Sequence, residues 1–318
     1  MKPILLSLLN TTEQDITALS PYYDVISIKS LDEGLALPTE TLERVEALFG
    51  AATRQVSIEF LDALPNLKVI SSFGVGFDPY DESYITGRKI RLGYTPDVLN
   101  DCVADLAFAL LLDCARQVSA SDRYVREGRW VTEGIFPLGV QVSGKRLGIV
   151  GLGRIGIEIA ERAKGFRMDV IYHNRNPRTD VPYRYVESLI ELAKQSDFLV
   201  IATPGGPSNA KLINQEVLEA LGPEGYLINI ARGVVVDEDA LVAALQSRTI
   251  AGAGLDVFVN EPHVPEALFE LDNVTICPHI ASATIETRGA MRDLAIENFI
   301  HFAKHGEVKV AVPWANYA

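Results

Sequence analysis

An arginine, a glutamate and a histidine each follow a separate predicted strand in the second half of the sequence. Arg232 lies in "LINIARG", Glu261 lies in "LDVFVNEP", and His279 lies in "NVTICPH". The carboxyl ends of parallel strands meet at one sheet edge, where open α/β sheets bind ligands. Carbonyl reduction requires a cation to polarise substrate oxygens, a proton donor, and a carboxylate that orients and charges the imidazole. Each residue alone could be an ordinary ion pair, but together they predict a catalytic site.

The other histidines occupy less suitable positions. His173 falls in a loop, His263 in a Pro-rich loop, and His301 and His305 on the last predicted helix. His279 is therefore the candidate proton donor.

A glycine-rich turn, "GLGRIG", precedes this site in the chain. It follows the predicted strand "KRLGIV" and opens the predicted helix "RIGIEIAERAKG". In such a turn Gly151 makes the tight bend, Gly153 admits a pyrophosphate, and Gly156 lets helix and strand pack closely. The pattern alone is weak, but this context predicts a dinucleotide site that also includes Arg154 and Ile155.

The stretch "MDVIYHNRNP" lacks the acid that usually binds the adenosine ribose, since Asp169 lies at the wrong end of the strand. Asn174 and Arg175 stand there instead, and both can donate to a 2′-phosphate that a carboxylate would repel. The sequence therefore favours NADP(H), with NAD(H) possible. Arg178 could contribute to the phosphate site, and the alternative is that Arg175 and Arg178 are solvated loop cations.

Alternating strands and helices place these motifs in an α/β fold with parallel sheets. The first series of strands is "PILLSLL", "YDVISI", "LKVISS" and "IRLGYT". The second has six strands, the number of a doubly wound dinucleotide domain: "RLGIVG", "MDVIYH", "DFLVIAT", "GYLINIA", "AGAGLDV" and "NVTICPH".

Three helical stretches stand out between and after these strands. "TETLERVEALF" is expected to be helical within the first series. A helix from Asp101 to Trp130 is apolar on nearly every face in its first half, so we expect it to be buried between domains or subunits. "ETRGAMRDLAIENFIHFAKHG" predicts one long amphipathic helix near the end of the chain.

Composition excludes several classes of protein. The 318 residues are 48% hydrophobic, which suits two globular domains, and the net charge of −13 disfavours nucleic acid and anionic membranes as partners. Three cysteines without CxxC spacing suggest reduced thiols rather than disulfides. No predicted segment targets the chain to a membrane or for export, so cytoplasm is the expected location, and no metal site is expected.

Together, "GLGRIG", "NIARGVVVDEDAL", "GLDVFVNEP" and "NVTICPHIASAT" resemble the D-isomer-specific 2-hydroxyacid dehydrogenases. The likeness covers nearly the whole chain and is strongest to the glyoxylate/hydroxypyruvate reductase and hydroxyphenylpyruvate reductase branches. It implies that His279 is the general acid/base, that Glu261 keeps the imidazole charged, and that Arg232 binds the 2-keto acid. It further implies cofactor contacts at Thr203, Pro204, Ala231 and Asp256.

The resemblance also gives a role to "SSFGVGFDPYD". The backbone amides of Val75 and Gly76 would bind the substrate carboxylate, whereas the sequence alone leaves a simple turn equally acceptable. Phe77 would contact the substrate side chain or pack internally. Phe136 and Leu138 lie in a segment that in some relatives reaches a neighbouring subunit's active site.

The expected architecture is a Rossmann cofactor domain, residues 100–286, inserted into a flavodoxin-like substrate domain, residues 1–99 completed by 287–318. The resemblance implies that the substrate lies in the interdomain cleft and that the chain forms a homodimer through residues 101–116 and the segment that follows. The expected function is NADPH-dependent reduction of a small 2-keto acid, glyoxylate or hydroxypyruvate, to the D-2-hydroxy acid. Alternatives are an aryl-pyruvate (hydroxyphenylpyruvate) reductase and a dinucleotide-sensing corepressor-like protein.

Overall fold

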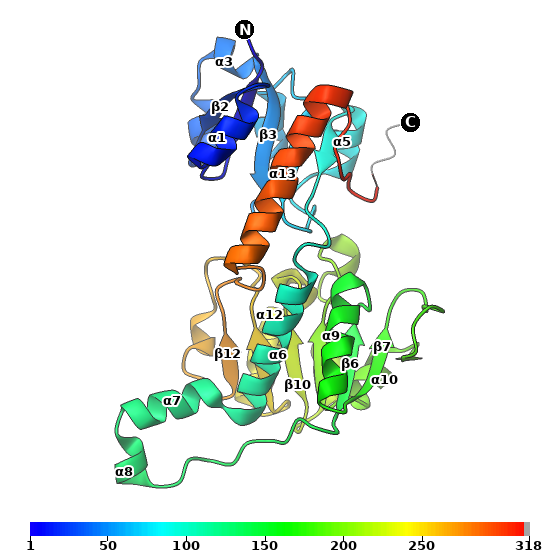
Figure 1. Cartoon of the computed structure of the whole chain (residues 1–318). Coiled ribbons are helices and arrows are strands. Elements are labelled where there is room, and N and C mark those ends of the chain that lie inside the picture. The colour runs from blue at the N-terminus through cyan, green and yellow to red at the C-terminus, as the bar shows by residue number, and fades with distance from the viewer. Residues whose placement is uncertain (315–318) are drawn as a thin grey trace. The chain divides into compact units, whose positions relative to one another are not determined.

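The computed structural model describes residues 1–314, and the chain divides into two compact units (Figure 1). Unit 1 contains Met1–Leu99 and the chain from Thr284 onward, and unit 2 contains Asn100–Ala283. The chain thus leaves unit 1, forms the whole of unit 2, and returns to complete unit 1.

Unit 1 contains a parallel sheet of five strands in the order β2-β1-β3-β4-β5, which is the order of flavodoxin-like sheets. Side chains of β1 alternate between two apolar cores, so that Leu6 packs on one face and Leu5 on the other, both fully buried. Burial on both faces explains why the strand is a continuous apolar run. The strands are β1 (Ile4–Ser7), β2 (Asp24–Ser27), β3 (Val45–Ala51), β4 (Val69–Phe73) and β5 (Arg91–Gly93).

The long helix α13 (Ile285–His305) packs along β4 and α1 within unit 1 (Figure 1). Arg292 of α13 pairs with the buried Asp15 of α1. The fully buried Asn298 donates to Ser71 of β4 and to the carbonyl of Tyr94. These contacts attach α13 to β4, the strand that leads into the turn at Gly74. The other helices of the unit are α1 (Glu13–Leu19), α2 (Leu31–Leu35), α3 (Thr39–Leu42), α4 (Ile58–Asp62) and α5 (Glu82–Gly87).

The prediction of a helix over "TETLERVEALF" is wrong for most of its length. Only Thr39–Leu42 is helical, and Val45–Ala51 forms β3, the central strand of the sheet. Glu, Ala and Leu favour helix locally, but burial between β1 and β4 favours the strand, and tertiary packing overrides propensity.

Unit 2 contains a parallel sheet of seven strands in the order β12-β11-β10-β9-β6-β7-β8. The six expected strands are all present, and the short β8 extends the sheet beyond β7. The order of connection reverses at β6, which lies between β7 and β9, and ligands of doubly wound sheets bind at such a switch point. The strands are β6 (Arg146–Val150), β7 (Asp169–His173), β8 (Arg184–Tyr185), β9 (Phe198–Ile201), β10 (Tyr226–Asn229), β11 (Gly252–Leu255) and β12 (Val274–Ile276).

Helices cover both faces of this sheet. Side chains of α10, α11 and α12 join one apolar core, while α6 and α9 pack against each other on the other face (Figure 1). These helices and the 3-10 turns are α6 (Asn100–Arg116), α9 (Arg154–Gly165), α10 (Leu189–Lys194), η1 (Pro207–Asn209), α11 (Gln215–Leu221), η2 (Gly233–Val235), α12 (Glu238–Gln246) and η3 (Glu266–Leu268).

The helix expected over residues 101–130 is interrupted. α6 ends at Arg116 because Gln117 adopts a left-handed conformation with φ of 53°, and two shorter helices follow, α7 (Val118–Arg126) and α8 (Arg129–Glu133). α7 and α8 extend away from the sheet of unit 2 (Figure 1). Within residues 1–314, none of the helices is both long enough and apolar enough to cross a membrane.

Candidate active site

The three glycines of the turn between β6 and α9 have different surroundings. Gly151 has φ of +97°, and a Cβ atom there would lie 2.7 Å from the Thr203 nitrogen. A Cβ on Gly156 would lie 2.4 Å from the Gly151 carbonyl oxygen, whereas one on Gly153 would meet nothing within 4 Å. No side chain caps the helix that begins after Gly153. The open Gly153 and the uncapped N-terminus therefore fit a dinucleotide pyrophosphate.

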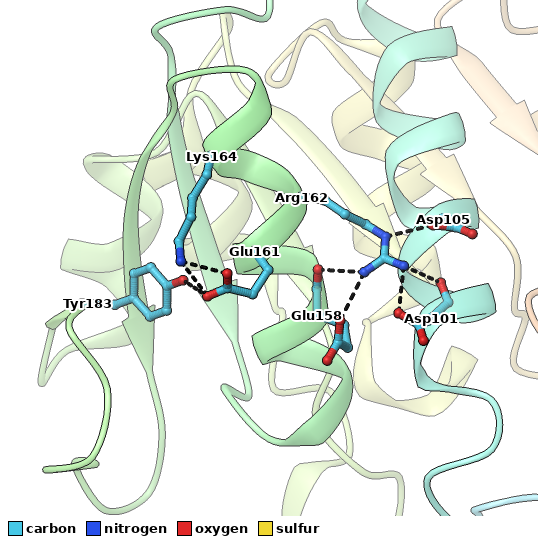
Figure 2. Close-up of polar contacts among 7 residues, drawn as sticks. All are labelled: Asp101, Asp105, Glu158, Glu161, Arg162, Lys164 and Tyr183. Carbon is cyan, nitrogen blue, oxygen red and sulfur yellow. Dashed lines mark hydrogen bonds and ion pairs between the residues drawn. The ribbon is translucent and has the colours of Figure 1, made fainter.

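Arg162 of α9 fixes this helix against α6 (Figure 2). Its guanidinium donates to Asp101 at 2.9 Å, to Asp105 at 2.6 Å and to Glu158 of its own helix at 3.1 Å. The hydrogen bond from Arg162 lowers the pKa of Asp101. These bonds attach α9, whose first residues are Arg154 and Ile155, to α6.

A second polar cluster on α9 anchors the segment that follows β7 (Figure 2). The hydroxyl of Tyr183 lies 2.8 Å from Glu161, whose carboxylate also accepts from Lys164 at 2.6 Å. The hydrogen bond from Lys164 lowers the pKa of Glu161. The end of the loop that precedes β8 is therefore held against α9.

The loop after β7 contacts the glycine-rich turn through Asn174. The Asn174 side-chain oxygen accepts from the Leu152 N–H at 2.6 Å, and its carbonyl accepts from Tyr185 at 3.2 Å. The Asn174 amide NH₂ remains as the donor that the side chain can offer a ligand. This arrangement places Asn174 and Arg175 directly beside the turn.

Gly233 lets the backbone that follows Arg232 lie directly against the segment that leads to Glu261. A Cβ on Gly233 would lie 2.0 Å from the Phe258 carbonyl carbon. The Arg232 side chain donates to the Ala231 carbonyl at 2.8 Å, and a Cβ on Gly205 would lie 2.8 Å from its Cγ. Thr203 and Pro204 belong to the same loop as Gly205, after β9.

His279 and Glu261 form the closest pair of the predicted site. Nδ1 of His279 lies 2.7 Å from Oε2 of Glu261, while Oε1 accepts the Phe258 N–H at 3.0 Å. Burial would raise the pKa of Glu261, but the hydrogen bonds from His279 and Phe258 and the charge of Arg232 hold it below its ordinary value. An ionised Glu261 assigns the Nδ1 proton to His279 and leaves Nε2 for a reacting atom.

Asp256 holds the turn that carries His279. Its carboxylate is fully buried and accepts the N–H groups of Ile280 and Ala281, each at 2.8 Å, and its carbonyl accepts the His279 N–H at 2.9 Å. His279 itself has φ of 54°, a conformation that a residue with a side chain rarely adopts. Burial raises the pKa of Asp256, opposed by these hydrogen bonds.

The turn after β4 in unit 1 presents free backbone donors. Gly74 has φ of +144° and is held by Thr95, whose hydroxyl accepts the Gly74 N–H at 3.0 Å. Within residues 1–314, no protein acceptor is recorded for the N–H groups of Val75 and Gly76. Consecutive free N–H groups of this kind suit an anion such as a carboxylate.

Three aromatic or apolar residues left open by the sequence have defined surroundings. Phe77 packs edge-on against Tyr94 and Trp314, so its ring belongs to a core of unit 1. Phe136 packs against Tyr124 of α7. Leu138 is 93% exposed.

Sequence reasoning missed residues that shape the site from loops and strand ends. The buried Asn229 accepts the Ala231 N–H and donates to the Arg232 carbonyl, at 3.1 Å and 3.0 Å. A buried polar residue at the end of an apolar strand was a usable signal for Asn229. Thr95 carries no such signal. Among residues 1–314, no cluster of His, Cys, Asp and Glu is arranged to hold a metal ion.

The chain is similar in sequence to known proteins. Residues 108–281 match the family model of the D-isomer specific 2-hydroxyacid dehydrogenase NAD binding domain. The chain is 47% identical over 262 residues to a hydroxyphenylpyruvate reductase of Plectranthus scutellarioides, an alignment covering 82% of this chain and 83% of that protein. It is 45% identical over 260 residues to a glyoxylate/hydroxypyruvate reductase A of Arabidopsis thaliana, covering 81% and 83%.

A solved structure matches almost the entire chain. The NADPH-dependent glyoxylate/hydroxypyruvate reductase of Sinorhizobium meliloti, crystallised with NADP and malonate, superposes with a TM-score of 0.93 at 41% identity, covering 99% of this chain and 98% of that one. The match includes both parallel sheets, which confirms the expected fold. The chain belongs to the D-isomer-specific 2-hydroxyacid dehydrogenase family.

Proposed function

We propose that this protein reduces a small 2-keto acid, glyoxylate or hydroxypyruvate, to the D-2-hydroxy acid with NADPH. The observation that carries the proposal is the hydrogen-bonded pair of His279 and Glu261, with the charge of Arg232 acting on the same carboxylate. The relatives named for glyoxylate and hydroxypyruvate reduction support the substrate class, and the NADP complex of the S. meliloti enzyme supports the cofactor.

The residues have distinct roles in this proposed reaction. The glycine-rich turn, Asn174 and Arg175 hold NADPH, which supplies the hydride when it is bound. Arg232 binds the carboxylate and polarises the carbonyl of the keto acid, and the Val75 and Gly76 amides bind the carboxylate. His279 donates a proton from Nε2 to the carbonyl oxygen as the carbon receives the hydride, which gives the alcohol. Glu261 stabilises the imidazolium before transfer.

Unit 2 is proposed to bind the cofactor, because the glycine-rich turn and the switch point of its sheet lie there.

A second candidate function is reduction of an aryl-pyruvate. It rests on the 47% identity to the Plectranthus hydroxyphenylpyruvate reductase. The same polar groups would serve both substrates, since glyoxylate, hydroxypyruvate and hydroxyphenylpyruvate share the 2-keto acid group. The two functions differ only in what surrounds the substrate side chain.

The test is a matrix of initial rates. Glyoxylate, hydroxypyruvate and 4-hydroxyphenylpyruvate would each be offered with NADPH and with NADH over one range of concentrations. We expect the highest kcat/KM for hydroxypyruvate or glyoxylate with NADPH. A higher kcat/KM for 4-hydroxyphenylpyruvate would favour the second candidate. Binding of NADPH without turnover of any keto acid would favour the corepressor-like alternative.

The chain is further proposed to act as a homodimer in the cytoplasm. The segment from α7 to residue 138 carries a row of exposed apolar side chains, and scattered residues of α6 remain half-buried. An exposed apolar segment of this extent marks an interaction surface. The three free cysteines suit a reducing compartment. In the segment from α7 to residue 138, the most exposed apolar residues are Val131, Ile135 and Leu138.

A further inference from the structure

Two loops lie on either side of the glycine-rich turn. One follows β7 and carries Asn174 and Arg175, and the other follows β9 and includes η1. Nη2 of Arg175 lies 3.4 Å from the hydroxyl oxygen of Ser208 in η1. This contact brings together a cation and a hydroxyl from opposite loops.

The neighbouring cation is already committed to the protein. Arg178 forms a two-pronged ion pair with Asp180, with Nε to Oδ1 at 2.9 Å and Nη2 to Oδ2 at 2.5 Å. Its Nη1 donates to the Leu152 carbonyl of the glycine-rich turn at 3.1 Å. Arg178 therefore holds the loop after β7 against the glycine-rich turn, and Asp180 neutralises the charge of Arg178.

Arg175 differs from Arg178 in both respects. Its side chain is exposed, and no carboxylate within residues 1–314 pairs with it. Its recorded side-chain contact is the long one to Ser208. An uncompensated guanidinium beside a hydroxyl offers donors to an anion without first breaking an ion pair.

Ser208 is held in place by its own loop. The side chain of Asn209 donates to the Thr203 hydroxyl at 3.3 Å and to the Pro204 carbonyl at 2.9 Å. The Asn209 N–H donates to the Gly206 carbonyl at 3.1 Å. Thr203 also lies against Gly151 of the glycine-rich turn, so the position of Ser208 is set relative to the dinucleotide site.

We propose that Ser208 is a specificity-determining residue for the cofactor, and that its hydroxyl and Arg175 bind the 2′-phosphate of NADP(H) from opposite loops. A phosphate carries close to two negative charges and three acceptor oxygens, more than one guanidinium satisfies. The ribose 2′-hydroxyl of NADH offers neither the charge nor these oxygens. The inference rests on the proposed use of NADP(H) and adds a residue from a second loop.

The test is a comparison of dissociation constants without turnover. Binding of NADPH and NADH to Ser208→Ala would be followed by nicotinamide fluorescence, and binding of adenosine 2′,5′-bisphosphate and 5′-AMP by calorimetry. We expect about tenfold weaker binding of NADPH and of the bisphosphate, from the loss of one hydrogen bond to a charged group. Affinity for NADH and 5′-AMP should not change.

Three further variants test whether the effect depends on the hydroxyl group at position 208. Ser208→Thr keeps the hydroxyl and should restore affinity for the bisphosphate. Ser208→Asp places a carboxylate near the phosphate and should weaken NADPH more than Ser208→Ala while sparing NADH. Thr179→Ala removes an exposed hydroxyl from the loop after β7 and should change neither constant.

The outcomes separate this inference from the proposed function. If Ser208→Ala weakens NADPH and NADH equally, or neither, while Arg175→Ala weakens NADPH alone, the role of Ser208 is overturned and the proposed cofactor stands. If the wild-type protein binds NADH as tightly as NADPH, the proposed cofactor and the role of Ser208 both fail.

Discussion

Nδ1 of His279 lies 2.7 Å from Oε2 of Glu261, and the second oxygen of that carboxylate accepts the Phe258 N–H. Both oxygens of Glu261 are thus fixed, and the imidazole is oriented by a carboxylate that cannot rotate without losing a backbone hydrogen bond. Asp256 holds the backbone of the turn that carries His279. The imidazole proposed as the proton donor is therefore held in one orientation by the protein itself.

Removing the imidazole should separate chemistry from binding. His279→Ala should lower kcat for hydroxypyruvate reduction by about 10²–10⁴-fold, the usual contribution of a general acid. The Kd for NADPH should stay nearly the same, because the glycine-rich turn lies on other strands. Glu261→Gln should lower kcat less, since the imidazole remains. Stopped-flow rates and fluorescence titrations on the same preparations measure both quantities, and a parallel loss of NADPH binding in His279→Ala would contradict the assigned role.

Glu261 should also make stability depend on pH. Its pKa in the folded protein lies below the ordinary value of 4.5, so it contributes stability that is present above 4.5 and is lost as pH falls through the lower, folded value. Urea unfolding at pH 7 should therefore show Glu261→Gln to be less stable than wild type. The difference should shrink when both are unfolded below pH 4.5.

The matched control for this measurement is His279→Ala. It removes the first hydrogen bond that lowers the Glu261 pKa while leaving the carboxylate in place. The folded pKa of Glu261 should then rise back toward 4.5, so the stability lost as pH falls below 4.5 should be smaller than in wild type. A Glu261→Gln difference that is constant with pH would show that the carboxylate gains nothing from its neighbours.

At the glycine-rich turn, adding a single methyl group can distinguish an effect on cofactor binding from an effect on stability. Gly153→Ala places Cβ in open space, so the free energy of unfolding should change by less than about 1 kcal/mol. The added methyl should still exclude the pyrophosphate and weaken NADPH strongly. Gly156→Ala places Cβ 2.4 Å from the Gly151 carbonyl oxygen and should destabilise the protein by about 1–3 kcal/mol.

Thermal denaturation with and without NADPH checks both variants. Wild type should show an increase in Tm with cofactor, because a ligand that binds only the folded state stabilises it. Gly153→Ala should keep the wild-type Tm in the absence of cofactor but lose the increase. If Gly153→Ala retained the full increase, the phosphates would not approach the backbone at this position.

Much of the fold could be predicted because its strands are buried on both faces and read as apolar runs. The prediction of a helix at β3 failed because "RVEALF" combines strong helix formers with apolar residues. Only the position of this segment between β1 and β4 makes it a strand. β8 has two residues, too few to show a periodicity. Gln117 gives no sequence signal for the left-handed conformation that ends α6.

The candidate site also contains residues whose placement the sequence predicts and residues whose placement it does not. Glu261 and His279 follow neighbouring parallel strands, β11 and β12, so their meeting at one sheet edge follows from topology. Ser208 and Thr95 take their places from loop conformation and from contacts with residues distant in sequence. Nothing in the local pattern distinguishes Ser208 from any other surface serine.

The exposed segment after α6 should prove to be the contact between two copies. Val131 and Ile135 are each 92% exposed, so aspartate at both positions costs the single chain little, whereas burying two carboxylates in a dimer interface is costly. Wild type should sediment at twice the 34.8 kDa mass of the chain, and the double variant Val131→Asp/Ile135→Asp at the mass of one. Ile16→Asp on α1, at an exposed apolar residue of unit 1, is the control and should remain dimeric. A double variant that stays dimeric would place the interface elsewhere.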